Sequence, residues 1–187
     1  MAEYYLISQL PSLDGVGDNT PLPITEERFT ELCERFLGKR ALREIKNLTI
    51  SPSMNFESTA SALINAWCDG ERNLRLALCK IRAEKMNKSF DIPNVNIPQE
   101  AFKAAITASE MKNPLDAEKF LLQYRLSFLE MLRPMDNFSE EYVFYYALKL
   151  KLLSRIYCFD ATLGESVYKK IYSSILDGEG LEAKDEQ

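Results

Sequence analysis

The sequence predicts an all-α protein, a multi-helix bundle of about seven or eight helices with a short irregular N-terminal segment. Apolar residues recur at helical spacing in most segments, and polar and apolar residues alternate over only one short run, at residues 4–10. Hydrophobic residues fill 46% of the 187 positions, which is enough to build a core. We expect one helical domain over residues 1–177, or two sub-bundles that meet near residues 89–98, followed by an acidic flexible tail over residues 178–187.

The first strongly amphipathic helix is predicted to begin near Thr25, after a loop rich in glycine and proline. Gly38 is a suitable residue to end it. Its apolar side chains recur at i, i+3, i+4, i+7 and i+8 and include one cysteine, for which we expect a structural role. These positions are Phe29, Leu32, Cys33, Phe36 and Leu37.

Apolar residues at helical spacing predict two further helices before the middle of the chain. One covers residues 42–48 and ends at Ser51-Pro52, because the residue before a proline is biased away from helix. The next contains Trp67, which we expect to pack between helices. Asp69-Gly70 is predicted to kink or break this helix.

Residues 71–87 form the main basic segment of the chain. Its basic side chains are spread around the helix, and only Arg72, Arg75 and Lys80 lie near one side. This side is either a binding face for a partner or a solvated helix face, and the sequence leaves open whether it meets protein, lipid or solvent.

The C-terminal half has the clearest helix boundaries. Asn113-Pro114 predicts a capped helix start, and Pro134 predicts the end of that helix. Ser139 opens the next helix, whose apolar positions over residues 142–156 nearly encircle it, so we expect it to pack antiparallel to its predecessor. The last helix has a one-sided apolar stripe and is predicted to stop at Gly178-Glu179-Gly180.

The chain contains no histidine, the side chain that most often moves protons and binds catalytic metals near neutral pH. Ser-His-Asp and Cys-His catalytic arrangements are therefore excluded, and so is a di-iron site with Glu-x-x-His pairs. Neither Gly15-Val16-Gly17 nor Gly38-Lys39 completes a nucleotide-binding motif. We therefore predict no catalytic residue, no cofactor and no metal site.

One enzymatic alternative stays open: a divalent-metal-dependent helical enzyme that uses carboxylates on a phosphorylated substrate. Glu26-Glu27 and Glu140-Glu141 are adjacent acidic pairs of the kind such a site would need. Both pairs fall in first helical turns, where compensation of the helix dipole explains them better than catalysis does.

The charge balance and the cysteines restrict the expected cellular location and the classes of partner. The 23 Lys and Arg against 28 Asp and Glu give a net charge of −5, which argues against a nucleic-acid partner. The start lacks the basic and apolar regions of a signal peptide, and the longest apolar run is far below the ~20 residues of a spanning helix. Four scattered cysteines predict reduced, mostly buried thiols. We expect a cytoplasmic protein that reaches a membrane only indirectly, through partners.

Five segments carry a resemblance to a known family. In chain order they are Tyr4-Tyr5-Leu6-Ile7-Ser8-Gln9-Leu10-Pro11-Ser12-Leu13, Trp67 with Glu71-Arg72-x-Leu74-Arg75, Asn113-Pro114-Leu115-x-Ala117-Glu118, Tyr146-x-Leu148-Lys149-Leu150 and Asp160-x-x-x-Gly164. Together they resemble a family of uncharacterised bacterial proteins encoded beside V-type ATPase subunits.

This resemblance implies a non-catalytic accessory or central-stalk-type subunit of a V/A-type ATPase, similar in helical character to the C (d) subunit that seats the stalk. The chain is considerably shorter than that subunit, so a full socket role does not follow. V-type ATPase subunits are then the expected partners, with a peripheral position at the inner face of the membrane. Tyr4, Tyr5, Arg72 and Arg75 are our predicted partner-binding residues, and a regulatory scaffold unrelated to ATPases is the remaining alternative.

Overall fold

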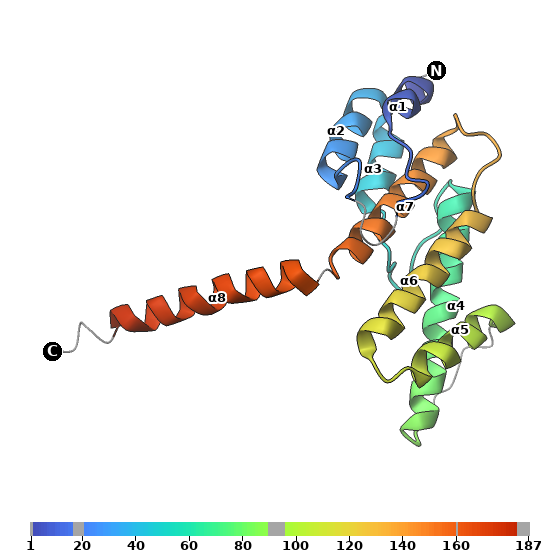
Figure 1. The fold of residues 1–187 in the computed structure, drawn as a ribbon. Coiled ribbons are helices and arrows are strands. Elements are labelled where there is room, and N and C mark those ends of the chain that lie inside the picture. Colours follow the sequence, from blue (N-terminus) through green and yellow to red (C-terminus); the bar gives the residue numbers. More distant parts are fainter. Residues whose placement is uncertain (1, 17–20, 90–95, 160, 183–187) are drawn as a thin grey trace. The chain divides into compact units, whose positions relative to one another are not determined.

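The computed structural model describes residues 2–16, 21–89, 96–159 and 161–182, and these residues form eight helices and no strand (Figure 1). The predicted all-α class is thus confirmed for the described part of the chain. The helices are α1 (Ala2–Gln9), α2 (Glu26–Phe36), α3 (Lys39–Asn47), α4 (Ala62–Lys85), α5 (Gln99–Glu110), α6 (Pro114–Met131), α7 (Glu140–Tyr157) and α8 (Ala161–Glu182).

The chain divides into two compact units, Met1–Ile156 and Tyr157–Gln187. Residues 90–95, where the sequence places the junction of two sub-bundles, and residues 183–187 of the predicted tail lie outside the described residues. The domain boundaries expected from the sequence therefore stay a prediction. In the second unit, α8 runs to Glu182 and passes through Gly178-Glu179-Gly180, so the predicted stop at these glycines is wrong.

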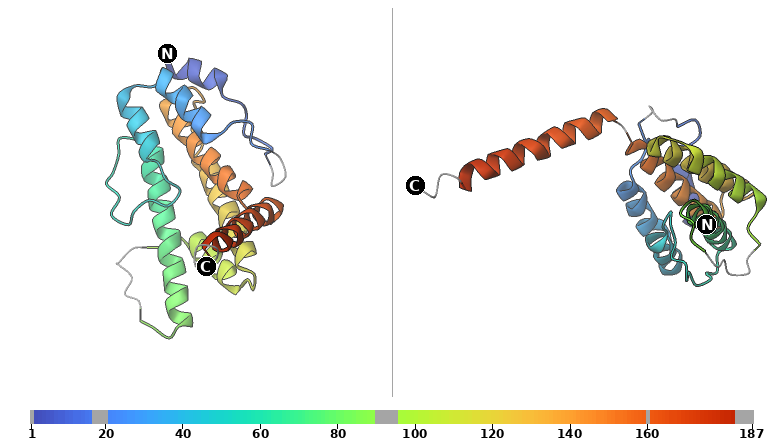
Figure 2. Two further views of the ribbon diagram at one scale, coloured as in Figure 1. Left: turned by 90° about the vertical axis from the view of Figure 1, so that its left-hand side faces the viewer. Right: turned by 90° about the horizontal axis from the view of Figure 1, so that it is seen from below.

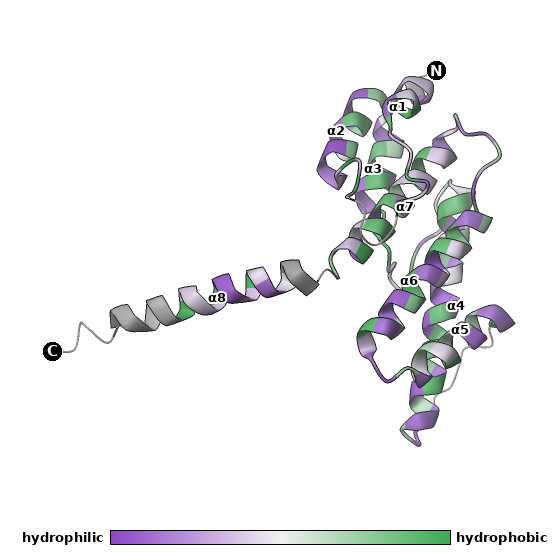
Figure 3. Ribbon diagram, in the orientation of Figure 1, coloured by the Kyte–Doolittle hydropathy of each residue, from purple (hydrophilic) through white to green (hydrophobic). Residues whose placement is uncertain are grey.

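The core of the first unit is built on α4 and α7. Helix α4 is 24 residues long and contributes eleven buried side chains, and Figure 2 shows it extending along the unit. Every residue of α7 from Val143 to Leu150 is buried, which confirms that apolar contacts nearly encircle this helix. Figure 3 shows hydrophobic and hydrophilic residues interspersed along the other helices of this unit, as expected for helices with one buried face.

Helix α7 packs antiparallel to α6, as predicted. Tyr145 near the start of α7 donates a hydrogen bond of 2.7 Å to Glu130 near the end of α6. Arg155 near the end of α7 lies 3.2 Å from Glu118 near the start of α6. Contacts that pair the start of one helix with the end of the other require opposite directions.

The helix starts follow the capping residues in the sequence. The Asn113 side chain accepts a hydrogen bond of 3.1 Å from the N–H of Leu115, and the Ser139 hydroxyl accepts one of 3.2 Å from the N–H of Tyr142. Both caps satisfy N–H groups that have no partner inside their helix. The predicted starts of α6 and α7 are therefore confirmed at the level of single hydrogen bonds.

The N-terminal segment, which we expected to be irregular, forms α1 and then a loop. This helix has only 8 residues, too few for stable helix formation in isolation. Leu6 is completely buried and α1 packs against α2. Tertiary packing rather than local propensity therefore holds α1 in place.

Helix α4 runs unbroken through Asp69-Gly70, so the predicted break is wrong. A Cβ atom at Gly70 would overlap the ring of Phe128 on α6. The same ring lies 6.2 Å from the ring of Trp67, which is 1% exposed and so has the packing role predicted for it. Gly70 thus allows α4 and α6 to approach closely, and this need explains a glycine inside a helix.

We expect Gly70→Ala to lower the melting temperature of the protein. Alanine gains about 1 kcal/mol of helix propensity over glycine. Overpacking costs typically about 1–3 kcal/mol, so displacement of Phe128 should outweigh this gain. Thermal unfolding followed by circular dichroism measures the difference.

Gly164→Ala is the matched control, because Gly164 also lies inside a helix, and a Cβ atom added there would meet no atom of the described residues within 4 Å. It should leave the melting temperature unchanged or raise it. If Gly70→Ala melted at or above the wild-type temperature, close packing of Gly70 against Phe128 would be ruled out.

Candidate interaction surface

Three exposed rings from distant parts of the sequence form one surface, which we call the aromatic patch: Tyr4 and Tyr5 of α1, and Phe138 of the α6–α7 connection. Their exposed fractions are 53%, 58% and 50%. The ring centroids of Tyr4 and Phe138 lie 4.9 Å apart, and those of Tyr4 and Tyr5 lie 5.9 Å apart. Figure 1 shows α1 and the α6–α7 connection at the same end of the first unit.

Local structure explains why these rings face outward. Leu6 turns into the core, and Tyr4 and Tyr5 are one or two residues away, so helical geometry directs them away from it. Phe138 sits in a turn in which its N–H donates a hydrogen bond of 2.8 Å to the Asp136 side chain. The patch is therefore presented by a short helix and a hydrogen-bonded turn.

Arg72 and Arg75, the other predicted partner-binding residues, are half-buried on α4 and bound within the chain. The Arg72 guanidinium lies 2.9 Å from the Asp69 carboxylate, and Arg75 donates to the backbone carbonyl of Pro52. No contact among the described residues joins either arginine to Tyr4 or Tyr5. The structure thus brings the two tyrosines together and leaves the arginines apart, and the role of all four stays a prediction.

Phe138 was missed by the sequence analysis. The available signal was a large apolar residue directly after Asp136-Asn137, a pair typical of turns, where no helical stripe needs it. Met135, three residues earlier, is fully exposed. A ring contact with Tyr4, 134 positions earlier in the numbering, could not be read from this local pattern.

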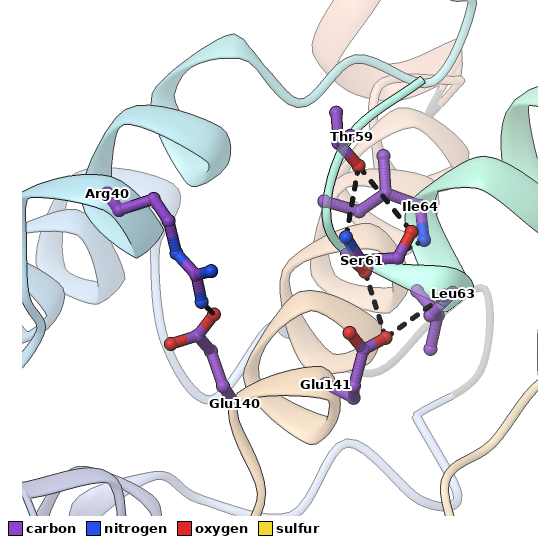
Figure 4. Close-up of polar contacts among 7 residues, drawn as sticks. All are labelled: Arg40, Thr59, Ser61, Leu63, Ile64, Glu140 and Glu141. Carbon is purple, nitrogen blue, oxygen red and sulfur yellow. Dashed lines mark hydrogen bonds and ion pairs between the residues drawn. The ribbon is translucent and has the colours of Figure 1, made fainter.

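The acidic pair Glu140-Glu141 ties the start of α7 to two other helices (Figure 4). Glu140 lies 2.6 Å from the guanidinium of Arg40 on α3. Glu141 accepts hydrogen bonds from the Ser61 hydroxyl at 2.8 Å and from the N–H of Leu63 at 3.0 Å, at the start of α4. The pair lies in the first turn of α7, as predicted, and its carboxylates cross-link helices.

An ion pair between Glu71 of α4 and Arg125 of α6 lies inside the first unit. Two hydrogen bonds of 2.9 Å join the carboxylate and the guanidinium, and the residues are 3% and 9% exposed. Burial acts to lower the pKa of Arg125, but the hydrogen bonds and charge of Glu71 outweigh it and raise the pKa. The two side chains are therefore paired with each other and hold two helices together.

Lys149 of α7 holds a second charged cluster together. Its ammonium lies 2.7 Å from the Asp14 carboxylate, 2.7 Å from that of Glu130 and 3.3 Å from the Tyr145 hydroxyl. Burial acts to lower the pKa of Lys149, but hydrogen bonds to Asp14 and Glu130 raise it overall. The same hydrogen bond lowers the pKa of Asp14, whereas burial raises that of Tyr145 to about 12. The cluster ties the N-terminal loop and α6 to α7.

The cysteines are all free, and two of the four lie inside. Cys33 and Cys68 are buried, whereas Cys79 and Cys158 are exposed, so the expectation of mostly buried thiols is wrong for the latter two. Burial raises the pKa of the Cys33 thiol to about 12 and that of Cys68 to about 11, which fits the structural role predicted for Cys33.

Within the described residues, no three or more Asp, Glu or Cys side chains are grouped so as to hold a metal ion. None of the described helices combines the length and apolar character that crossing a bilayer requires. The metal-dependent enzyme weighed in the sequence analysis stays a prediction.

Comparison with protein-family models, curated proteins and solved structures gives no match to this chain.

Arg125→Met should strongly destabilise the protein, because it leaves the Glu71 carboxylate buried without its partner. Breaking a buried ion pair in this way costs about 3–5 kcal/mol. The double variant Glu71→Leu/Arg125→Met should recover much of this loss, since an apolar pair replaces both charges. Urea unfolding measures the free energy of unfolding of the wild type and both variants. A double variant as unstable as Arg125→Met would contradict a pairing role.

Asp14→Asn should lower the melting temperature at pH 7, and the difference from wild type should disappear in acid. The pKa of Asp14 is lower in the folded protein than in the unfolded chain, so its contribution is present above the unfolded value of about 3.9. The contribution is lost as the pH falls through the folded pKa. Melting curves from pH 7 to pH 2 measure this convergence.

Glu110→Gln is the control for this series, since it removes an exposed carboxylate at the end of α5. Its melting temperature should follow that of the wild type across the range. A constant difference between Asp14→Asn and wild type down to pH 2 would show that the contact with Lys149 is not electrostatic.

Proposed function

We propose that this chain is a non-catalytic accessory or central-stalk-type subunit of a bacterial V-type ATPase and acts through protein–protein contacts. The choice of partner rests on the resemblance of five sequence segments to proteins encoded beside such ATPases. The observation that supports action through protein–protein contacts is the aromatic patch. Tyr4, Tyr5 and Phe138 are each at least half exposed, and the rings of Tyr4 and Phe138 are in contact.

Aromatic side chains supply much of the binding energy of protein interfaces, because they bury a large area with few rotatable bonds. A ring already in contact with a neighbouring ring loses little further freedom when a partner covers it. Tyrosine also offers a hydroxyl for the polar edge of an interface. The aromatic patch has the composition of an interface centre.

A subunit that couples parts of a rotary machine must keep its shape under load, and the first unit is cross-linked accordingly. Glu71 and Arg125 join α4 to α6, Lys149 joins α7 to α6 and to the N-terminal loop, and Glu140 joins α7 to α3. These charged contacts run between helices that also share a packed core. In this proposal the protein is cytoplasmic and reaches the membrane only through the ATPase.

The test is capture of purified V-type ATPase subunits by the tagged full-length chain. Tyr4→Ser/Tyr5→Ser/Phe138→Ser should weaken capture at least about tenfold, since a single interface hot spot already contributes about 2 kcal/mol. Met54→Ser/Met86→Ser, which replaces two hydrophobic side chains exposed elsewhere, should leave capture unchanged. Circular dichroism confirms that each variant is folded.

The same assay includes Arg72→Glu/Arg75→Glu to test the second predicted contact pair. Weaker capture by this variant, with an unchanged melting temperature, would assign the arginines to the interface. Unchanged capture by the triple aromatic variant would remove the aromatic patch from the interface. Failure of the wild-type chain to capture any ATPase subunit would overturn the proposed function.

A further inference from the structure

A cavity of about 340 Å³ lies in the first unit, between the last turn of α3, the loop that follows it and the first turns of α4. Leu48, Pro52, Phe56 and Ile64 give it mainly apolar walls. Its volume is at the lower end of the roughly 300–1,000 Å³ typical of ligand sites. Since a cavity of about 150 Å³ accepts benzene, this one has room for a ring with a short chain.

The loop that forms one wall is fixed by polar contacts. Arg75 donates to the carbonyl of Pro52, and at the other end the N–H of Thr59 donates a hydrogen bond of 2.8 Å to the Asn65 side chain. Asn65 in turn donates one of 2.8 Å to the carbonyl of Thr59. Figure 4 shows Thr59 beside Ile64, another wall residue, at the start of α4. The cavity is therefore a preformed feature of an anchored loop.

The cavity wall includes one carboxylate, that of Glu44. Glu44 lines the cavity and is half-buried, and no ion pair or hydrogen bond engages its carboxylate among the described residues. Asn47 lines it too, at the last residue of α3, where backbone carbonyls lack partners inside the helix and the helix dipole is negative. The nearby cation Lys46 is already held by Glu34 at 2.7 Å.

We propose that this cavity binds a small organic amine, an aromatic or branched aliphatic group that carries a primary ammonium. The apolar part would fill the space between Leu48, Phe56 and Ile64, and the ammonium would donate to the Glu44 carboxylate and the adjacent end of α3. A neutral molecule of the same shape would gain only the apolar contacts, and an anion would be repelled. This proposal is independent of the proposed function, since it concerns a different surface and a different kind of ligand.

The test uses three probes of similar size: 2-phenylethylamine, 2-phenylethanol and 3-phenylpropionate. Each is titrated into the full-length chain at neutral pH and followed by amide NMR shifts. We expect the amine to bind roughly five- to tenfold more tightly than the alcohol, as one charge-assisted hydrogen bond allows. The acid should bind more weakly than either, and shifts should concentrate in residues 44–68.

Two substitutions separate the charge contribution from the apolar contribution. Glu44→Gln should reduce affinity for the amine to that for the alcohol while leaving the alcohol unchanged. Phe56→Ala, in a loop and therefore tolerated by the fold, should weaken both. Glu57→Gln, an exposed glutamate outside the cavity lining, is the matched control and should keep the preference for the amine.

The proposal is overturned if the alcohol and the acid bind as tightly as the amine, if Glu44→Gln retains the full preference, or if shifts lie outside residues 44–68. A ligand this small is expected to bind with a dissociation constant of roughly 1 mM. Absence of binding at about 10 mM amine would therefore overturn the proposal as well. None of these results bears on capture of ATPase subunits, so failure of this inference and failure of the proposed function can be told apart.

Discussion

The crossing of α4 and α6 is fixed by the buried ion pair of Glu71 and Arg125, and much of the first unit depends on it. Removing two charges from water is costly, and two hydrogen bonds of 2.9 Å offset that cost only in one relative placement of the helices. Gly70 and Trp67 meet Phe128 at the same crossing. Charge pairing and close packing therefore specify one register, and α5 packs against both helices.

Side chains of helix α7 hold the N-terminal end of the chain in place. It is buried on almost every side, so polar groups on it must find partners. The Tyr146 hydroxyl donates a hydrogen bond of 2.8 Å to the carbonyl of Pro11, and Lys149 contacts Asp14. Both partners belong to the loop that follows α1. The position of Tyr4 and Tyr5 thus depends on contacts made deep in the bundle, through a helix too short to be stable by itself.

The sequence predicted features that are set locally and missed those that depend on distant residues. Helical periodicity and the caps at Asn113 and Ser139 act within one or two turns, and the structure confirms them. Gly70 suggested a break because its partner, Phe128, lies on another helix. Phe138 was missed for the same reason, since only its contact with Tyr4 turns two separate rings into a surface. The cavity beside Glu44 likewise involves distant residues, since Arg75 and Asn65 on α4 anchor the loop that forms one wall.

The backbone from residue 138 to residue 141 connects the two surfaces of the first unit. Phe138 belongs to the aromatic patch, and three residues later Glu141 holds Ser61 and Leu63, beside the cavity wall at Ile64. Because residues 140 and 141 are already in a helix, their spacing is fixed and they cannot move independently. The start of α7 therefore lies between the turn that carries one ring of the aromatic patch and the helix start next to one wall of the cavity, although the two surfaces share no side chain.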